Sequence, residues 1–187
     1  MVAHSTLTDP ELHEPKGVSS ATSGSVYVAN GVGSGSWVEL YKACSVAFSP
    51  STASPYVHNA TSTDAILNPT TTVLTNTGGF TRLTSPNFRI RYDGLQTFIA
   101  TVTVDVSTSS GTGSRDMQLV LFKNGTALPF SRIYNNMPNN ANWFSTGFTY
   151  QVSLSTNDYI EVAHASGTSG NISYAKFSVT VSGATVQ

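Results

Sequence analysis

The chain has 187 residues, a formal net charge of −1 and 10% charged residues, against about a quarter in an average protein. Such a neutral surface has no electrostatic footprint for nucleic acid or an anionic membrane, so we expect neither as a partner. No apolar run approaches the ~20 residues that span a bilayer, and the first residues lack the apolar core of a secretory signal. We therefore expect a protein that is made in a cytoplasm and stays soluble.

Residues 1–40 are predicted to form an extended N-terminal arm. Ser, Thr and Gly dominate it, and Pro10 and Pro15 flank a short charged cluster. Pro removes backbone donors and Gly raises the entropic cost of ordering, so this segment is not expected to build its own core. One stretch combines an apolar residue, both charges and a rigid proline, and we interpret it as an anchoring epitope: Leu12, His13, Glu14, Pro15 and Lys16.

Strand patterns recur from residue 41 onward, and we predict a single head domain over residues 41–187. Strands are expected at 41–48, 71–75, 87–92 and 95–106. The last has the clearest alternation, which places five residues on a core-facing side: Phe98, Ala100, Val102, Val104 and Val106. Cys44, the only cysteine, lies in the first strand, so no intrachain disulfide can form and the thiol is expected to be a small buried hydrophobe.

The segment Met117 to Tyr134 is predicted to be a β-hairpin. An apolar run leads to Asn124-Gly125, after which an extended segment resumes. A two-residue type I′ turn needs positive φ at both positions, which Asn and Gly adopt at low cost.

Further strands are expected at 143–154, 159–165 and 172–181, each bounded by polar turns. No window shows a helical period of 3.6 residues. About eight strands with short polar connections are typical of a β-sandwich or jelly roll. The fold class is therefore predicted to be all-β.

Four segments resemble the jelly rolls of complement C1q and tumour necrosis factor: DGLQTFIATVTVDV, MQLVLFKNGT, TYQVSLSTNDYIEV and ISYAKFSVTVSG. The motif residues are Lys123-Asn124-Gly125, Leu154 with Asp158, and Tyr174 with Phe177. Asn157 and Lys176 depart from the family pattern. The resemblance implies a C1q/TNF-like jelly-roll head that assembles as a homotrimer. Residues assigned to the trimer interface are Ile99, Thr101, Thr149 and Tyr174.

The arm is similar to N-terminal stretches of tailed-bacteriophage virion proteins, through Leu12 to Gly17 and Gly33 to Trp37. Together the two resemblances imply a homotrimeric virion protein that is made in the bacterial cytoplasm. In the first hypothesis it is a capsid decoration or cement protein, bound to the major capsid protein or another virion protein through its arm. The alternative is a tail-fibre or receptor-binding tip, whose loop at 134–143 would contact a host-surface glycan.

An enzyme is not expected. The acidic residues Asp105, Asp116, Asp158 and Glu161 are scattered singly, and no Ser-His-Asp order or paired-carboxylate motif stands out. His4 and His13 have no acidic or Cys partner at ligand spacing, so no metal and no cofactor are predicted.

Overall fold

The computed structural model describes residue 21 and residues 25–29, 35–39, 41–48, 54–110, 113, 115–137 and 142–185. The chain divides into two compact units, Met1–Tyr41 and Lys42–Gln187. In the first unit, strand β1 (Ser25–Ala29) pairs antiparallel with β2 (Gly35–Glu39), and the rings of Tyr27 and Trp37 meet edge to face at 5.5 Å. The predicted anchoring epitope, Leu12 to Lys16, lies outside the described residues.

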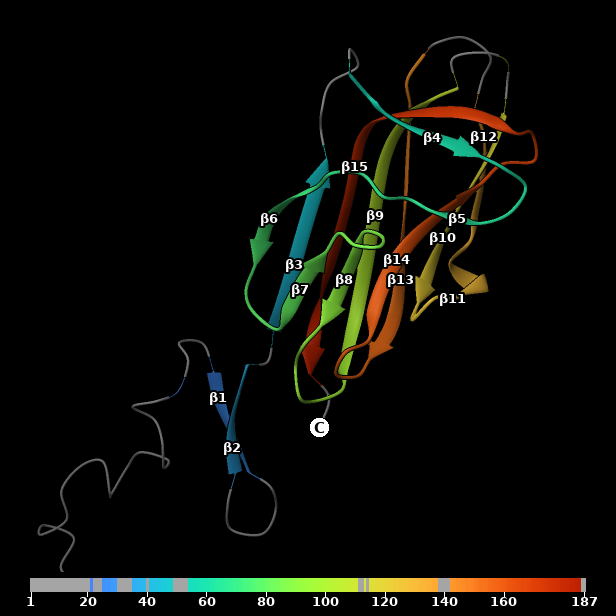
Figure 1. Ribbon diagram of the computed structural model, residues 1–187. Helices are drawn as coiled ribbons and strands as arrows, with labels where there is room; N and C mark the ends of the chain where they lie inside the picture. Colours follow the sequence, from blue (N-terminus) through green and yellow to red (C-terminus); the bar gives the residue numbers. More distant parts are fainter. Residues whose placement is uncertain are drawn as a thin grey trace, which may run out of the picture. The chain divides into compact units, whose positions relative to one another are not determined.

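Two antiparallel sheets make up the second unit (Figure 1). The first, here called the β9 sheet, has the order β13 (Phe144–Leu154), β9 (Phe98–Ser109), β15 (Gly170–Thr185), β3 (Tyr41–Phe48) and β6 (Thr72–Asn76), with β4 (Tyr56–Ala60) paired to β15. The second, the β14 sheet, has the order β11 (Thr126–Ala127), β10 (Arg115–Lys123), β14 (Tyr159–Ala165), β8 (Arg89–Tyr92) and β7 (Phe80–Leu83). In addition, β12 (Ile133–Met137) pairs with β10, and β5 (Ala65–Ile66) pairs with β14.

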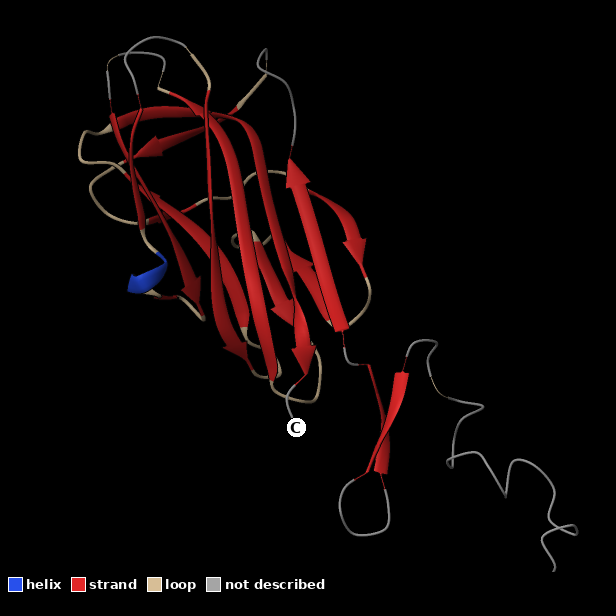
Figure 2. Cartoon of the chain, turned by 180° about the vertical axis from the view of Figure 1, so that it is seen from behind, coloured by secondary structure: helices blue, strands red, loops and turns tan. Residues whose placement is uncertain are grey.

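The chain crosses between the two sheets repeatedly. It passes from β8 to β9, from β9 to β10, from β13 to β14 and from β14 to β15, and each step changes sheet. Two packed sheets connected in this way form a jelly-roll β-sandwich, which confirms the predicted fold class. Among the described residues the one helical element is a 3₁₀ turn, Pro129–Ser131, drawn in blue in Figure 2. Within that part of the chain no helix has the length and apolar character to cross a membrane.

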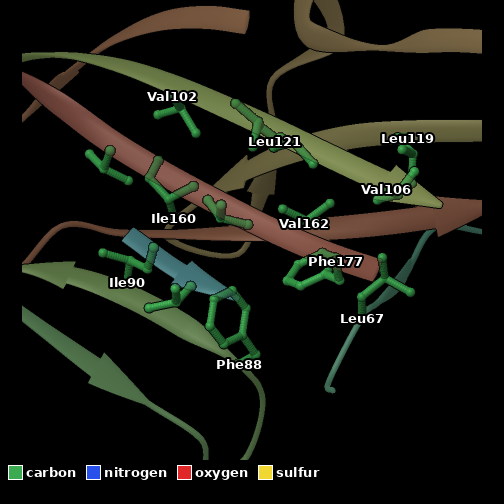
Figure 3. Close-up of a cluster of buried hydrophobic side chains, with 14 of the residues drawn as sticks. Leu67, Phe88, Ile90, Val102, Val106, Leu119, Leu121, Ile160, Val162 and Phe177 are labelled. Carbon is green, nitrogen blue, oxygen red and sulfur yellow. The ribbon is translucent and has the colours of Figure 1, made fainter. Parts of the chain in front are cut away.

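The core lies between the sheets, and strand alternation fills it. The predicted core-facing residues of β9, from Phe98 to Val106, are at most 1% exposed. They pack with side chains from the opposite sheet, including Leu119, Leu121, Ile160 and Val162 (Figure 3). Cys44 is also fully buried, as predicted, and burial raises the pKa of its thiol to about 11 although Arg82 opposes the shift. The thiol is therefore protonated at neutral pH and part of the core.

The predicted Asn-Gly turn is present. Asn124 has φ 53° and Gly125 has φ 76°, the positive values that a type I′ turn needs. The strand after the turn was predicted as one extended segment, but β11 has two residues and the 3₁₀ turn interrupts it before β12 pairs with β10 again. Pro129 explains the break, since proline has no N–H to donate to a ladder. The buried Ser131 hydroxyl accepts from the Leu121 N–H at 2.9 Å and donates to the Leu128 carbonyl at 2.7 Å.

Several short strands were not predicted from the sequence, namely β1 and β2 within the predicted arm and β4, β5 and β7 in the head, whereas β12 was predicted only in part. Each has five residues or fewer, and β4 contains His58 and Asn59, of which Asn is depleted in strands. Other predicted ends differ by a few residues: the closing strand runs from Gly170 to Thr185 instead of 172–181.

Candidate subunit interface

The outward face of the β9 sheet is the candidate site. Alternation sends one set of side chains of β9, β13 and β15 into the core and the other set outward, and cross-strand partners share a face. Thr103 of β9 lies opposite Thr149 of β13 on one side and Thr180 of β15 on the other. The outward set consists largely of Ser and Thr: Thr101, Thr103, Ser145, Thr149, Ser153, Ser178, Thr180 and Ser182.

This face, which we call the hydroxyl face, carries little charge. On the outward side of these three described strands, Asp105 and Lys176 are the charged residues. The hydroxyls partly satisfy one another: Thr103 and Thr149 are hydrogen bonded at 3.2 Å, and Ser45 of β3 bonds Thr180 at 3.0 Å. Gly147 of β13 sits against the Asp105 side chain and the Val104 carbonyl, where a Cβ would clash. The result is a polar and nearly neutral surface.

Three of the four predicted interface residues lie on this face. Ile99, Thr101 and Thr149 all point outward, and Ile99 is 42% exposed. Tyr174 does not join them: it is fully buried and shares a hydrogen bond of 2.6 Å with His164. Its side chain belongs to the protomer's own core and is not available to a neighbouring subunit. The part of the face that β15 contributes was not predicted, although the alternation of Ser178, Thr180 and Ser182 with valines signals it.

The outward side of the β14 sheet is different, because it carries ion pairs. Arg89 contacts Glu161 at 2.8 Å and its guanidinium lies 4.3 Å from the centre of the Tyr159 ring. Arg91 pairs with Asp93, and Arg132 pairs with Asp64, both at 2.6 Å. The hydrogen bond to Glu161 raises the pKa of Arg89, although partial burial opposes it. We call this the ion-pair face.

Motif residues far apart in the sequence meet at one turn. Lys123 Nζ contacts the Asp158 carboxylate at 2.7 Å, and Asn124 Nδ2 donates to the same carboxylate at 2.6 Å. Asn124 Oδ1 in turn accepts from the Tyr159 N–H at 2.9 Å. The Lys-Asn-Gly motif and the later Asp are thus two halves of one clamp, which secures the turn between β13 and β14.

The acidic residues weighed for catalysis occupy structural positions. Asp158 pairs with Lys123 and Glu161 pairs with Arg89. Across the described ranges no cluster of three or more His, Cys, Asp or Glu residues could hold a metal ion.

Exposed aromatic side chains form a second candidate surface. Phe130 of the 3₁₀ turn is 93% exposed and Tyr134 of β12 is 70% exposed. The predicted glycan-contacting loop at 134–143 begins here, but its residues 138–141 lie outside the described part of the chain.

No protein-family model matches this sequence, and no curated protein sequence matches it. Murine APRIL is 14% identical, with a TM-score of 0.47 over 75% of this chain and 98% of that chain. The Eiger TNF of S. frugiperda is 10% identical, with a TM-score of 0.49 over 79% and 96%. The globular domain of a zebrafish complement 1qA protein is 10% identical, with a TM-score of 0.43 over 75% and 94%. The assignment of an all-β jelly roll rests on the chain's own two sheets and their strand order.

Proposed function

We propose that this chain is a non-enzymatic structural protein of a bacteriophage virion, a homotrimer that decorates and stabilises the outer capsid shell. The observation that carries the proposal is the hydroxyl face, a polar and nearly neutral surface on a jelly roll whose other face carries ion pairs. Charged residues are depleted in the centres of protein interfaces, since burying an unpaired charge is costly. The hydroxyl face meets that requirement.

The trimer contact in this proposal is centred on Ile99, Thr101 and Thr149, to which we add Thr103 and Thr180. In a closed cyclic trimer each copy contacts its two neighbours through two different patches, and we place the hydroxyl face in one of them. Short Ser and Thr side chains lose little conformational entropy on burial.

The arm at residues 1–40 attaches the trimer to the shell in this proposal, and residues 41–187 form the head. Its basis is the resemblance of the short segments Leu12 to Gly17 and Gly33 to Trp37 to N-terminal stretches of phage virion proteins. The epitope Leu12, His13, Glu14, Pro15 and Lys16 docks in a groove of the major capsid protein or another virion protein. Three arms that act together give a much tighter attachment than one arm alone.

A receptor-binding tip is the second candidate function, and the exposed pair Phe130 and Tyr134 favours it. Aromatic rings with one polar end suit contacts with sugar faces, because they offer apolar area and a hydrogen-bonding group together. In this alternative the head, and not the arm, makes the contact that matters, and the ligand is a glycan of the host surface.

Binding of the purified protein to capsid shells that lack it separates the two functions. Leu12→Ala is expected to weaken attachment by ~1–3 kcal/mol per arm through lost apolar burial. Lys16→Ala is expected to weaken it mainly at low salt, because salt screens exposed ion pairs. The matched control is Phe130→Ser with Tyr134→Ser, which leaves shell binding unchanged.

If the arm variants attach to shells like the unmodified protein and the aromatic variant loses binding to host cells, the receptor-tip function replaces the proposed one. Copy number per particle gives an independent answer. Hundreds of copies support shell decoration, whereas a few dozen or fewer indicate a tail position.

A further inference from the structure

Two buried histidines link the two sheets of the jelly roll. His58 lies on β4, which pairs with β15 of the β9 sheet, and His164 lies on β14 of the opposite sheet. Their rings stack with centroids 5.4 Å apart and planes tilted by 28°. His164 has no exposed area and His58 is 9% exposed. This contact crosses the core and holds β4 against the sandwich.

The groups around the pair are aromatic. Tyr174 of β15 shares a hydrogen bond with His164 Nδ1 at 2.6 Å, and Tyr56 of β4 packs against the rings of His58 and Tyr174. The Nε2 atoms of His58 and His164 are buried without a hydrogen-bond partner among the described residues. An imidazolium at either position would have no anion beside it, so protonation is unfavourable in the packed state.

The pKa values of both rings agree with this geometry. Burial lowers the pKa of His58 below its usual 6.5. Burial, and secondarily the neighbouring His58, lowers the pKa of His164 to about 3. Burial also raises the pKa of Tyr174, so its hydroxyl stays protonated. No carboxylate contributes to either histidine shift within the described part of the chain, and both rings are neutral at pH 7.

We propose that the His58–His164 stack is an acid-sensitive latch that releases β4 from the jelly roll when the pH falls. β4 is the element that moves because it has five residues, pairs with β15 alone, and exposes Val57 and Asn59 to solvent. β14, by contrast, lies within its sheet between β10 and β8 and stays in place. The latch is a property of the head and does not depend on the proposed function.

The direction of the effect follows from proton linkage. A ring with a lowered pKa in the closed form takes up its proton only after release, so acid favours the open form between pH 6.5 and the lower value. His164 stays neutral at pH 5 in the closed form because its pKa is about 3. If it titrates at 6.5 when released, the opening equilibrium increases about 25-fold between pH 7 and pH 5.

Amide hydrogen exchange of the full chain at pH 7 and pH 5, corrected for intrinsic exchange rates, tests the latch. We expect the opening equilibrium of β4 to rise about 25-fold at pH 5. The opposite edge strand of the same sheet, β13, has no histidine and serves as the internal control. Equal protection of β4 at both pH values overturns the proposal.

His58→Phe keeps an aromatic ring in the stack but removes one of the two titrating groups, so the pH dependence of β4 exchange is expected to become smaller. A double variant, His4→Gln with His13→Gln, removes the other two histidines and is expected to keep it. A titration of the imidazole protons by NMR in the unmodified protein covers the case in which His58→Phe does not fold. Midpoints near 6.5 for both His58 and His164 would exclude the latch.

Discussion

The two outward faces of the jelly roll carry different kinds of polar side chain, although both are built from alternating strands. On the ion-pair face, Arg89, Arg91 and Arg132 each pair with a carboxylate, and these charged groups favour contact with water. On the hydroxyl face, threonines and serines offer hydrogen bonds without charge. Both faces can be exposed to water, but burial against another protein costs much less free energy for the hydroxyl face. A face without charge is therefore the one suited to assembly.

The largest expected effect is the loss of assembly when a charge enters the hydroxyl face. Thr103→Arg places a cation at the centre of β9, and each copy would bury it without a partner at a cost of about 3 kcal/mol or more. Light scattering after size exclusion should show a fall from about three times 19.8 kDa to 19.8 kDa. The control Tyr134→Arg, on the ion-pair side, should leave the trimer intact. If the Thr103→Arg variant is still a trimer, the interface lies on another surface.

A smaller effect is expected within the ion-pair face, where the pairs differ in burial. Glu161→Gln leaves the guanidinium of Arg89 without its carboxylate at a site where Glu161 is 2% exposed, so the unfolding free energy should drop by about 2 kcal/mol. Asp93→Asn removes a carboxylate that is 30% exposed and should cost less than ~1 kcal/mol. Urea unfolding of both variants measures the difference. Equal losses would show that burial does not distinguish the two pairs.

The turn between β13 and β14, which contains Asp158, is expected to make the stability of the head depend on pH. Burial raises the pKa of Asp158, but hydrogen bonds from Lys123, Asn124 and the Ser155 N–H outweigh it, so the pKa lies below its ordinary value of 3.8. The clamp therefore stabilises the head at neutral pH and loses its effect as the pH falls through the folded-state pKa. Asp158→Asn should lower the unfolding free energy by about 1 kcal/mol at pH 7 and make the curve flatter below pH 4. If the unfolding free energy of the variant falls below pH 4 as steeply as that of the unmodified protein, other carboxylates cause the acid sensitivity.

The smallest effect should come from apolar replacement on the hydroxyl face. Thr103→Val with Thr149→Val removes both partners of one hydrogen bond and keeps the side-chain shape, so stability should change by less than ~0.5 kcal/mol. The trimer should persist, as judged by light scattering. Dissociation of this variant would mean that hydrogen bonds from the hydroxyls, and not the low charge of the hydroxyl face, hold the proposed trimer together.

Local patterns in the sequence predicted the features that depend only on neighbouring residues, such as strand alternation and tight turns. The alternation in β9 identified its core-facing residues, and the Asn124-Gly125 pair identified a turn that needs positive φ. Partners far apart in the chain could not be predicted in this way. Nothing near Glu161 in the sequence indicates that Arg89, 72 residues away, lies beside it. Tyr174 was assigned to the interface for the same reason, because its partner His164 is on a different sheet.

The position of β15 has a consequence for how the chain is made. This strand, Gly170–Thr185, is the last in the sequence, yet it lies in the middle of the β9 sheet between β9 and β3. While a ribosome is still translating residues before 170, β9 and β3 each have one edge without its partner. The sheet can close only after residue 185 has left the exit tunnel. Until then the two strands expose edges that can pair with other nascent chains.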